Sequence, residues 1–169
     1  MTRLIRILTV VQTSMVAGML LSCPASAKAE QTPAISKSPA MVSISRSGSF
    51  ESSVVIMTRR VAVKETGPKA TVRKFGELYD WTPTYFAVRA DVPTRLKIWN
   101  LQPDDIHTFE LLGPHSRVLM LVSLQPLSKH SYVFTFHKTG LYKFVCTIHE
   151  PEMVGQIRVL PKAGGRADK

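Results

Sequence analysis

One short stretch near the C-terminal end carries the residues best suited to chemistry. A thiol, an imidazole and a thioether lie within eight residues, at Cys146, His149 and Met153. A second imidazole, His107, follows a predicted strand that ends at Asn100. Soft sulfur ligands combined with imidazole favour copper, and two histidines, one cysteine and a weak axial methionine are typical of blue-copper electron-transfer sites. The pattern therefore predicts a copper site built from two separate segments of the chain.

This combination of residues resembles the cupredoxins, the family of plastocyanin, azurin, amicyanin and pseudoazurin. In that family an early histidine follows a loop that contains asparagine, and a late Cys-x2-His loop ends in Met-x-Gly before the final strand. The chain has His107, Cys146, His149 and Met153, followed by Gly155. The resemblance covers roughly residues 70–160. It implies one type 1 copper ion per chain, held by those four residues, and electron transfer rather than catalysis. Three residues separate His149 from Met153, so the loop is intermediate between plastocyanin-like and amicyanin-like lengths.

The residue after the first ligand differs from the family pattern, because Thr108 stands where asparagine is common. We expect its hydroxyl to bond toward Thr147, although a hydroxyl offers fewer hydrogen-bond donors than an amide. Hydrogen bonds to a copper-bound thiolate tune the reduction potential, so this position matters for function.

The remaining candidates for metal binding have simpler interpretations. His115, His130 and His137 lie in or near predicted turns, where solvated histidines are expected. Glu150 and Glu152 are interpreted as exposed loop acids rather than as oxygen ligands.

Two other functions are weighed against an electron carrier. A copper carrier or chaperone would favour exposed clusters of methionine and histidine, which a closed set of four ligands does not provide. A catalytic protein resembling nitrosocyanin would have glutamate at position 107 and histidine in place of the axial methionine, and this chain has neither. A binuclear centre would need a second cysteine in the ligand loop, and position 150 is glutamate. A copper nitrite reductase would need a second domain, for which 169 residues are too few.

The pattern along the chain predicts many short strands and no major helix. Alternating apolar residues are clearest over 86–98, 107–112, 132–136 and 141–146, and turn residues separate these runs. Residues 50–63 suggest one or two further strands, and residues 70–80 a weakly alternating one. Along 141–146 the period of two places Tyr142, Phe144 and Cys146 on one face. Short strands at this spacing predict an all-β sandwich, and the resemblance makes it a Greek-key cupredoxin β-sandwich.

The first residues predict export. Arg3 and Arg6 precede an apolar run over 7–21, and the small residues 25–27 follow, which is typical of a secretory signal peptide over 1–27. Lipoprotein anchoring through Cys23 is the alternative. Residues 28–49, rich in Ser, Ala, Pro and Lys, are expected to form a flexible linker. The cupredoxin domain is expected at 50–161, followed by a basic tail at 162–169. We expect the mature protein in the periplasm.

The cysteine and the charge also bear on function. Removal of the leader would leave Cys146 as a lone thiol in an exported protein, where thiols normally pair; metal ligation explains it, although a small buried hydrophobic residue is the alternative. The chain carries a formal net charge of +10, and +8 after loss of the two leader arginines. Such charge suits an acidic redox partner such as a cytochrome or an oxidoreductase, with a membrane surface as the alternative and no nucleic acid. We expect a monomer.

Overall fold

The computed structural model describes residues 33–35 and 41–164. The expected signal peptide, the alternative anchor Cys23 and the last five residues of the expected basic tail lie outside the described residues. Within the described ranges no helix is both long enough and apolar enough to cross a membrane.

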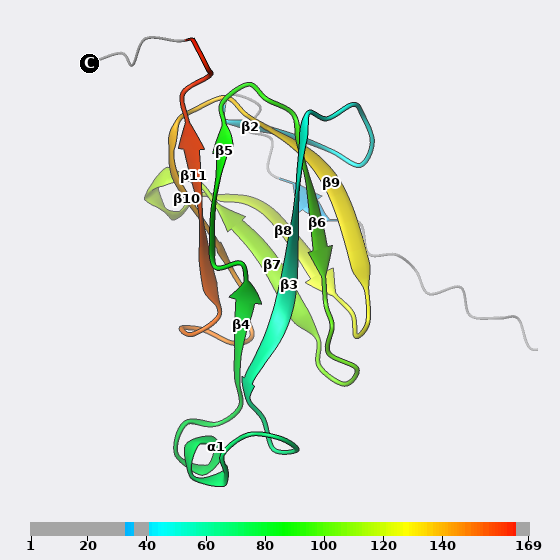
Figure 1. Ribbon diagram of the computed structural model, residues 1–169, viewed down its shortest axis with the longest axis vertical. Coiled ribbons are helices and arrows are strands. Elements are labelled where there is room, and N and C mark those ends of the chain that lie inside the picture. The colour runs from blue at the N-terminus through cyan, green and yellow to red at the C-terminus, as the bar shows by residue number, and fades with distance from the viewer. Residues whose placement is uncertain (1–32, 36–40, 165–169) are drawn as a thin grey trace, which may run out of the picture. The chain divides into compact units, whose positions relative to one another are not determined.

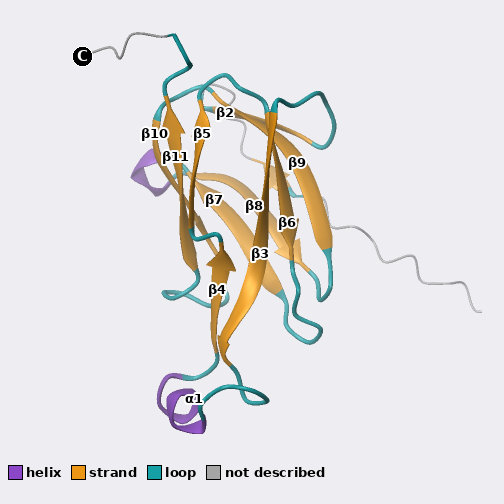
Figure 2. Cartoon of the chain, in the orientation of Figure 1, coloured by secondary structure: helices purple, strands orange, loops and turns teal. Residues whose placement is uncertain are grey.

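Two mixed sheets form a β-sandwich (Figures 1 and 2). One sheet has the strand order β1-β8-β7-β10-β11-β5, and the other has the order β2-β9-β6-β3-β4. Most strands pair antiparallel, but β3 pairs parallel with β6 and β11 pairs parallel with β5. The strands are β1 (Ala34–Ile35), β2 (Val42–Ser45), β3 (Ser52–Ala62), β4 (Leu78–Thr82), β5 (Tyr85–Arg89), β6 (Thr94–Trp99), β7 (His107–Leu112), β8 (Val118–Leu124), β9 (Lys129–Phe136), β10 (Gly140–Val145) and β11 (Val154–Leu160). The predicted all-β sandwich is confirmed.

The core between the sheets is built from the alternating positions of these strands. Leu96 and Ile98 of β6 are fully buried, and so are Tyr142 and Phe144 of β10. Aromatic rings fill much of this space, and Trp81, Phe109 and Phe144 contact one another with centroids between 5.5 and 5.9 Å apart. Such edge-to-face and offset contacts add to the burial energy of each ring.

Two regions differ from what the sequence pattern predicts. Within the expected linker 28–49, β1 pairs with β8 and β2 pairs with β9, so these residues extend the two sheets. Short strands at a sheet edge need few apolar residues, because only one side of the strand packs against the protein, and composition therefore did not reveal them. The expected strand over 70–80 is also wrong in its first half, where helix α1 (Lys69–Phe75) forms, while its second half begins β4. A short 3-10 helix, η1 (Pro114–Ser116), completes the elements.

Of the one or two strands expected over 50–63, one forms, β3. The buried Thr58 and the half-buried Arg60 alternate with exposed residues along β3, and both side chains form hydrogen bonds with the side chain of Gln102. A register shift between Arg60 and Ala62 marks a bulge where β3 leaves the sheet.

Candidate metal centre

Strand β10 carries the thiol into the interior. Tyr142 and Phe144 alternate along it, Cys146 continues the alternation directly after the strand ends at Val145, and all three are fully buried, as the period of two predicted. Cys146 is a free thiol. Its sulfur is therefore shielded from water.

The loop after Cys146 closes on itself through main-chain hydrogen bonds. The amide of His149 donates to the carbonyl of Cys146 (3.3 Å), and the amide of Met153 donates to the carbonyl of His149 (3.0 Å). The amide of Cys146 in turn donates to the carbonyl of Met153 (3.0 Å). These bonds hold the three residues of the loop in a compact arrangement.

Packing against Phe144 explains why glycine stands at position 155, just after this loop. A Cβ atom at this position would lie 2.1 Å from the ring of Phe144, on the neighbouring strand. Only glycine allows the ring to lie flat against β11, and the packing of β10 against β11 therefore depends on it.

The second imidazole comes from β7, which pairs directly with β10. His107 is the first residue of β7 and is fully buried. Its Nδ1 lies 3.7 Å from the sulfur of Cys146, and Nδ1 of His149 lies 3.5 Å from the same atom. The ligand atoms of the three residues all lie within 4.8 Å of one another. The structure thus brings together three of the four predicted ligands.

Met153, the fourth predicted ligand, is fully buried and belongs to the same core cluster. Its carbonyl accepts a hydrogen bond from the indole nitrogen of Trp81 (3.2 Å) in addition to that from Cys146. These contacts fix the main chain of the residue, and ligation by its sulfur stays a prediction. Two imidazole nitrogens, a thiolate and a buried thioether-bearing side chain form a donor set that fits one copper ion.

Burial keeps both imidazoles neutral. It lowers the pKa of His107 to about 4, assisted by the nearby His149. Burial also lowers the pKa of His149, while the charges of Asp105, Glu77 and Glu152 act weakly in the other direction. A neutral imidazole is the form that binds a metal, so both rings are ready to ligate near pH 7.

Tyr79 covers the two histidine rings and was not singled out by the sequence. It is buried on β4, with its ring centroid 5.0 Å from that of His107 and 4.6 Å from that of His149. Its hydroxyl donates a hydrogen bond to Asp105, and burial together with this bond raises the pKa of the phenol. Tyr79 therefore remains a protonated donor that fixes the rings from one side. Tyr79 and Trp81 alternate with half-buried residues along β4, and this alternation was the signal for a buried ring at position 79. The prediction of one weak strand over 70–80 did not use it.

Thr108 makes the predicted contact with Thr147 and a further one with Cys146. Its hydroxyl lies 2.9 Å from the hydroxyl of Thr147 and accepts a hydrogen bond from the Thr147 amide (2.8 Å). Its amide donates to the sulfur of Cys146 at 3.4 Å, and its hydroxyl lies 3.8 Å from that sulfur. Thr108 therefore ties the two ligand segments together and donates to the thiol.

A buried polar network, which the sequence pattern did not predict, supports the segment that carries His107. The side-chain amide of Asn100 donates to the carbonyls of Asp105 (2.8 Å), Leu124 (3.0 Å) and Gln125 (3.1 Å). Its oxygen accepts from the amide of Gln102 (3.0 Å) and the hydroxyl of Thr58 (3.1 Å). One buried side chain thus lies within hydrogen-bond distance of five partners, two N–H groups being shared among three carbonyls, and sets the path of the β6–β7 loop. The network joins β3, β6 and β8, so no local sequence pattern could reveal it.

Among the described residues, the other candidate histidines and acids are not part of the group of ligand atoms formed by His107, Cys146 and His149. His115 and His137 are exposed, and His137 contacts Asp91 and Ser43 at 2.8 and 2.9 Å. His130 is the second residue of β9, close to the turn that precedes this strand. Glu150 and Glu152 are exposed, as predicted.

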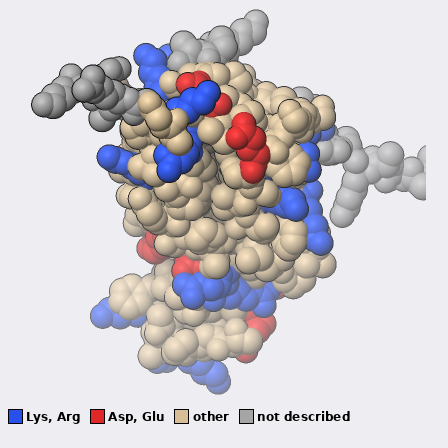
Figure 3. Space-filling view, turned by 45° about the horizontal axis from the view of Figure 1, so that its top comes forward, with Lys and Arg blue, Asp and Glu red and all other residues tan. Residues whose placement is uncertain are grey.

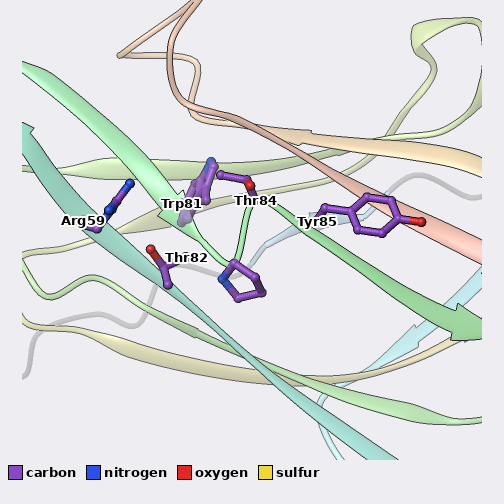
Figure 4. A pocket seen from close by; sticks show the side chains of 6 residues that line it. Arg59, Trp81, Thr82, Thr84 and Tyr85 are labelled. Carbon is purple, nitrogen blue, oxygen red and sulfur yellow. The ribbon is translucent and has the colours of Figure 1, made fainter.

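A shallow hollow of about 330 Å³ lies over the outer side of Trp81. Figure 4 shows residues that line this hollow at the turn between β4 and β5, among them Arg59, Trp81 and Tyr85. Arg59 is paired there with Asp80, so the hollow offers no free cation from this side chain.

Comparisons with known proteins define the fold. No protein-family model matches the chain, and no curated protein matches it. Among solved structures, a multicopper oxidase from Campylobacter jejuni, described as a metallo-oxidase, is similar with a TM-score of 0.51 and 11% identity over 69% of this chain. The chain spans about a third of that protein, 31% of its length.

Smaller proteins of similar structure are also found. Auracyanin B matches with a TM-score of 0.47 and 15% identity over 72% of this chain and 99% of its own. Auracyanin A, a "blue" copper protein from Chloroflexus aurantiacus, matches with a TM-score of 0.46 and 15% identity over 64% of this chain and 98% of its own. At 11% identity, the likeness to the multicopper oxidase shows the fold alone.

Proposed function

We propose that this chain, which has the cupredoxin fold, is an exported electron carrier with one type 1 copper ion and no catalytic activity of its own. The observation that carries the proposal is the convergence of His107, Cys146 and His149, whose ligand atoms lie within 4.8 Å of one another at one end of the sandwich. Two nitrogen donors and a thiolate, one from the start of β7 and two from the segment directly after its partner β10, form the donor set of such a site.

The four proposed ligands are His107 and His149 through Nδ1, and Cys146 and Met153 through sulfur. Bound copper would supply one-electron chemistry between its cupric and cuprous states. The chain contributes rigidity: β7 and β10 are paired, the loop over 147–153 closes on itself, and Tyr79 covers both rings. Ligands that are held in place need to move little when the charge of the site changes, which favours fast electron transfer.

The proposed route for the electron is the edge of His149. This ring is half-buried, whereas His107 is fully buried. Ile148 beside it has an exposed fraction of 53%, and Ile106 on the neighbouring loop has 45%. A partner could therefore approach His149 across exposed apolar side chains without any rearrangement of the sandwich.

Location and partner belong to the same proposal. The leader predicted over 1–27 supports export to the periplasm. The excess of positive charge supports an acidic redox partner, such as a cytochrome or an oxidoreductase. We propose that the carrier itself is a monomer. Complementary charge mainly raises the association rate, and salt screens it beyond about 10 Å at 0.1 M ionic strength.

The test is the visible and electron-spin-resonance spectrum of the purified protein after addition of one equivalent of Cu(II). We expect intense absorption in the visible range from thiolate-to-copper charge transfer, and one copper bound per chain. A colourless site that releases copper readily to a chelator would overturn the proposal and favour a copper carrier. A red site would favour a protein resembling nitrosocyanin.

A further inference from the structure

The segment between β3 and β4, residues 63–77, projects from the sandwich and is called here the α1 excursion. Figure 1 shows it beyond the ends of β3 and β4. Its first residue, Val63, is buried, and the carbonyl of Val63 accepts hydrogen bonds from the amides of Thr66 and Gly67. A Cβ atom at Gly67 would lie 2.6 Å from the main chain of Val63, so this turn requires glycine. The excursion therefore has a fixed base, while no residue of α1 itself is buried.

The helix at its tip is cationic. α1 carries Lys69, Arg73 and Lys74 and no acidic residue. None of the three forms an ion pair in the part of the chain that the structure describes, whereas Lys64 at the base lies 3.9 Å from Glu77. Lys69 and Arg73 are four positions apart and share one face of the helix. Figure 3 shows Lys and Arg atoms on several sides of the lobe at the bottom of the view.

An exposed aromatic ring accompanies this charge. Phe75, the last residue of α1, has an exposed fraction of 63%, and Nζ of Lys74 lies 5.1 Å from its ring centroid. Aromatic and cationic side chains together are typical of protein interfaces. A helix that binds a membrane surface would instead need a broad apolar face, and the seven residues of α1 offer one large apolar side chain.

The α1 excursion also lies beside the candidate metal centre. Tyr79, which touches both histidine rings, follows Phe75 by four residues, a separation of at most about 14 Å along the chain. The charge of Glu77 acts on His149. A protein bound to α1 would thus be close to the half-buried edge of His149.

We propose that the α1 excursion is the docking surface for an acidic patch on the redox partner protein. The proposal rests on the proposed function and makes it more specific: charge complementarity is located on Lys69, Arg73 and Lys74 rather than spread over the surface. Exposed Glu150 and Glu152 lie in the ligand loop and would repel the same acidic patch. This asymmetry gives the bound partner one orientation, with its acidic patch on α1 and its less charged part over His149.

The experiment measures binding of the copper-free protein to a purified acidic c-type cytochrome by isothermal titration calorimetry at low and high salt. The test variant is Lys69→Gln/Arg73→Gln/Lys74→Gln. The matched control, Arg117→Gln/Lys138→Gln/Lys162→Gln, removes the same charge from exposed positions. The pairing of β7, β10 and β11 places these control residues at the opposite end of the sandwich from Cys146.

We expect the affinity to fall about tenfold in the α1 variant, a loss of about 1.4 kcal/mol, and less than twofold in the control. Phe75→Ser is expected to weaken binding by a smaller factor that high salt does not remove. Melting temperatures should be unchanged, because none of these side chains is buried.

Two outcomes would overturn the proposal. Equal losses in both triple variants would show that net charge alone attracts the cytochrome. Loss of binding to phosphatidylglycerol vesicles in the α1 variant, with unchanged cytochrome binding, would assign the excursion to a membrane surface. Since the protein contains no copper in these measurements, their failure is distinct from a colourless spectrum, which would contradict the proposed function.

Discussion

The two segments that bring ligands to the candidate metal centre are held in different ways. The loop over 147–153 is closed by main-chain hydrogen bonds among Cys146, His149 and Met153. The segment that carries His107 depends instead on side chains from other strands, chiefly Asn100, which lies within hydrogen-bond distance of five partners. One ligand segment is therefore a local structure, and the other is a product of tertiary packing. The predictions below test this difference, beginning with the largest expected effect.

Substitution of the thiol in the local loop should have the largest effect. Cys146→Ser is expected to abolish the intense colour of the copper-loaded protein, because charge transfer from the thiolate produces it. The domain should remain folded, since serine is close to cysteine in size. The measurement is the visible spectrum, with circular dichroism as the check of folding. An unchanged spectrum would show that Cys146 is not a ligand.

Substitution in the tertiary network should instead act on stability. Asn100→Ala would leave several buried main-chain groups without a partner, and each such group costs roughly 1–3 kcal/mol. We expect the free energy of unfolding to fall by about 3 kcal/mol in urea denaturation. A matched loop variant, Thr147→Ser, keeps its hydroxyl and should change it by less than about 0.5 kcal/mol. Equal effects would contradict the contrast between the two segments.

Acid should destabilise the copper-free protein through the buried histidines. The pKa of His107 is about 4 in the folded protein, whereas an unfolded histidine titrates near pH 6.5. Between these values the unfolded chain binds a proton that the folded chain excludes, so the stability contributed by the neutral ring is fully present above about pH 6.5 and is lost as the pH falls toward 4.

Unfolding at pH 7.5, 5.5 and 4.5 measures this dependence. His107→Gln should reduce the slope of stability against pH, because glutamine does not titrate. His115→Gln, which alters an exposed histidine, is the control and should leave the slope unchanged. If both variants keep the full slope, the buried ring of His107 does not set the acid sensitivity.

Substitution of Met153, the last proposed ligand in the loop, should have a modest effect on the reduction potential. Met153→Leu is expected to keep the blue colour and to raise the reduction potential, because a weak thioether donor stabilises Cu(II) slightly. The swap nearly conserves volume, so the cost in stability should be below about 1.5 kcal/mol. Voltammetry of the copper-loaded protein measures the potential. No change in either potential or spectrum would mean that Met153 is not axial.

Removal of the side-chain contact between the two ligand segments should have the smallest effect. Thr108→Val removes the hydroxyl that lies 2.9 Å from that of Thr147 and 3.8 Å from the sulfur of Cys146. The amide of Thr108 still donates to the sulfur, so the thiolate loses only its weaker contact. We expect a small fall in the reduction potential, because a less stabilised thiolate donates more strongly to Cu(II). Thr108→Ser, which keeps the hydroxyl, should restore the original value.

The sequence by itself determined the spacing of the ligands in the loop and the buried face of the strand that precedes it. The spacing of Cys146, His149 and Met153 is local, and a loop this short can bring them together only in a few ways. The alternation of Tyr142 and Phe144 with exposed residues likewise fixed which face of β10 is buried, because the period of a strand depends on its main chain alone.

The tertiary structure decided what depends on contacts between distant segments. Asn100 joins the β6–β7 loop to β3 and β8, and Tyr79 reaches the histidine rings from β4. Neither role follows from neighbouring residues. The strands β1 and β2 within the expected linker formed because sheet edges were available to pair with them, and α1 is helical although no residue of it is buried. Edge pairing and buried hydrogen bonds are satisfied only when the whole sandwich has assembled, so a pattern read along the chain does not contain them.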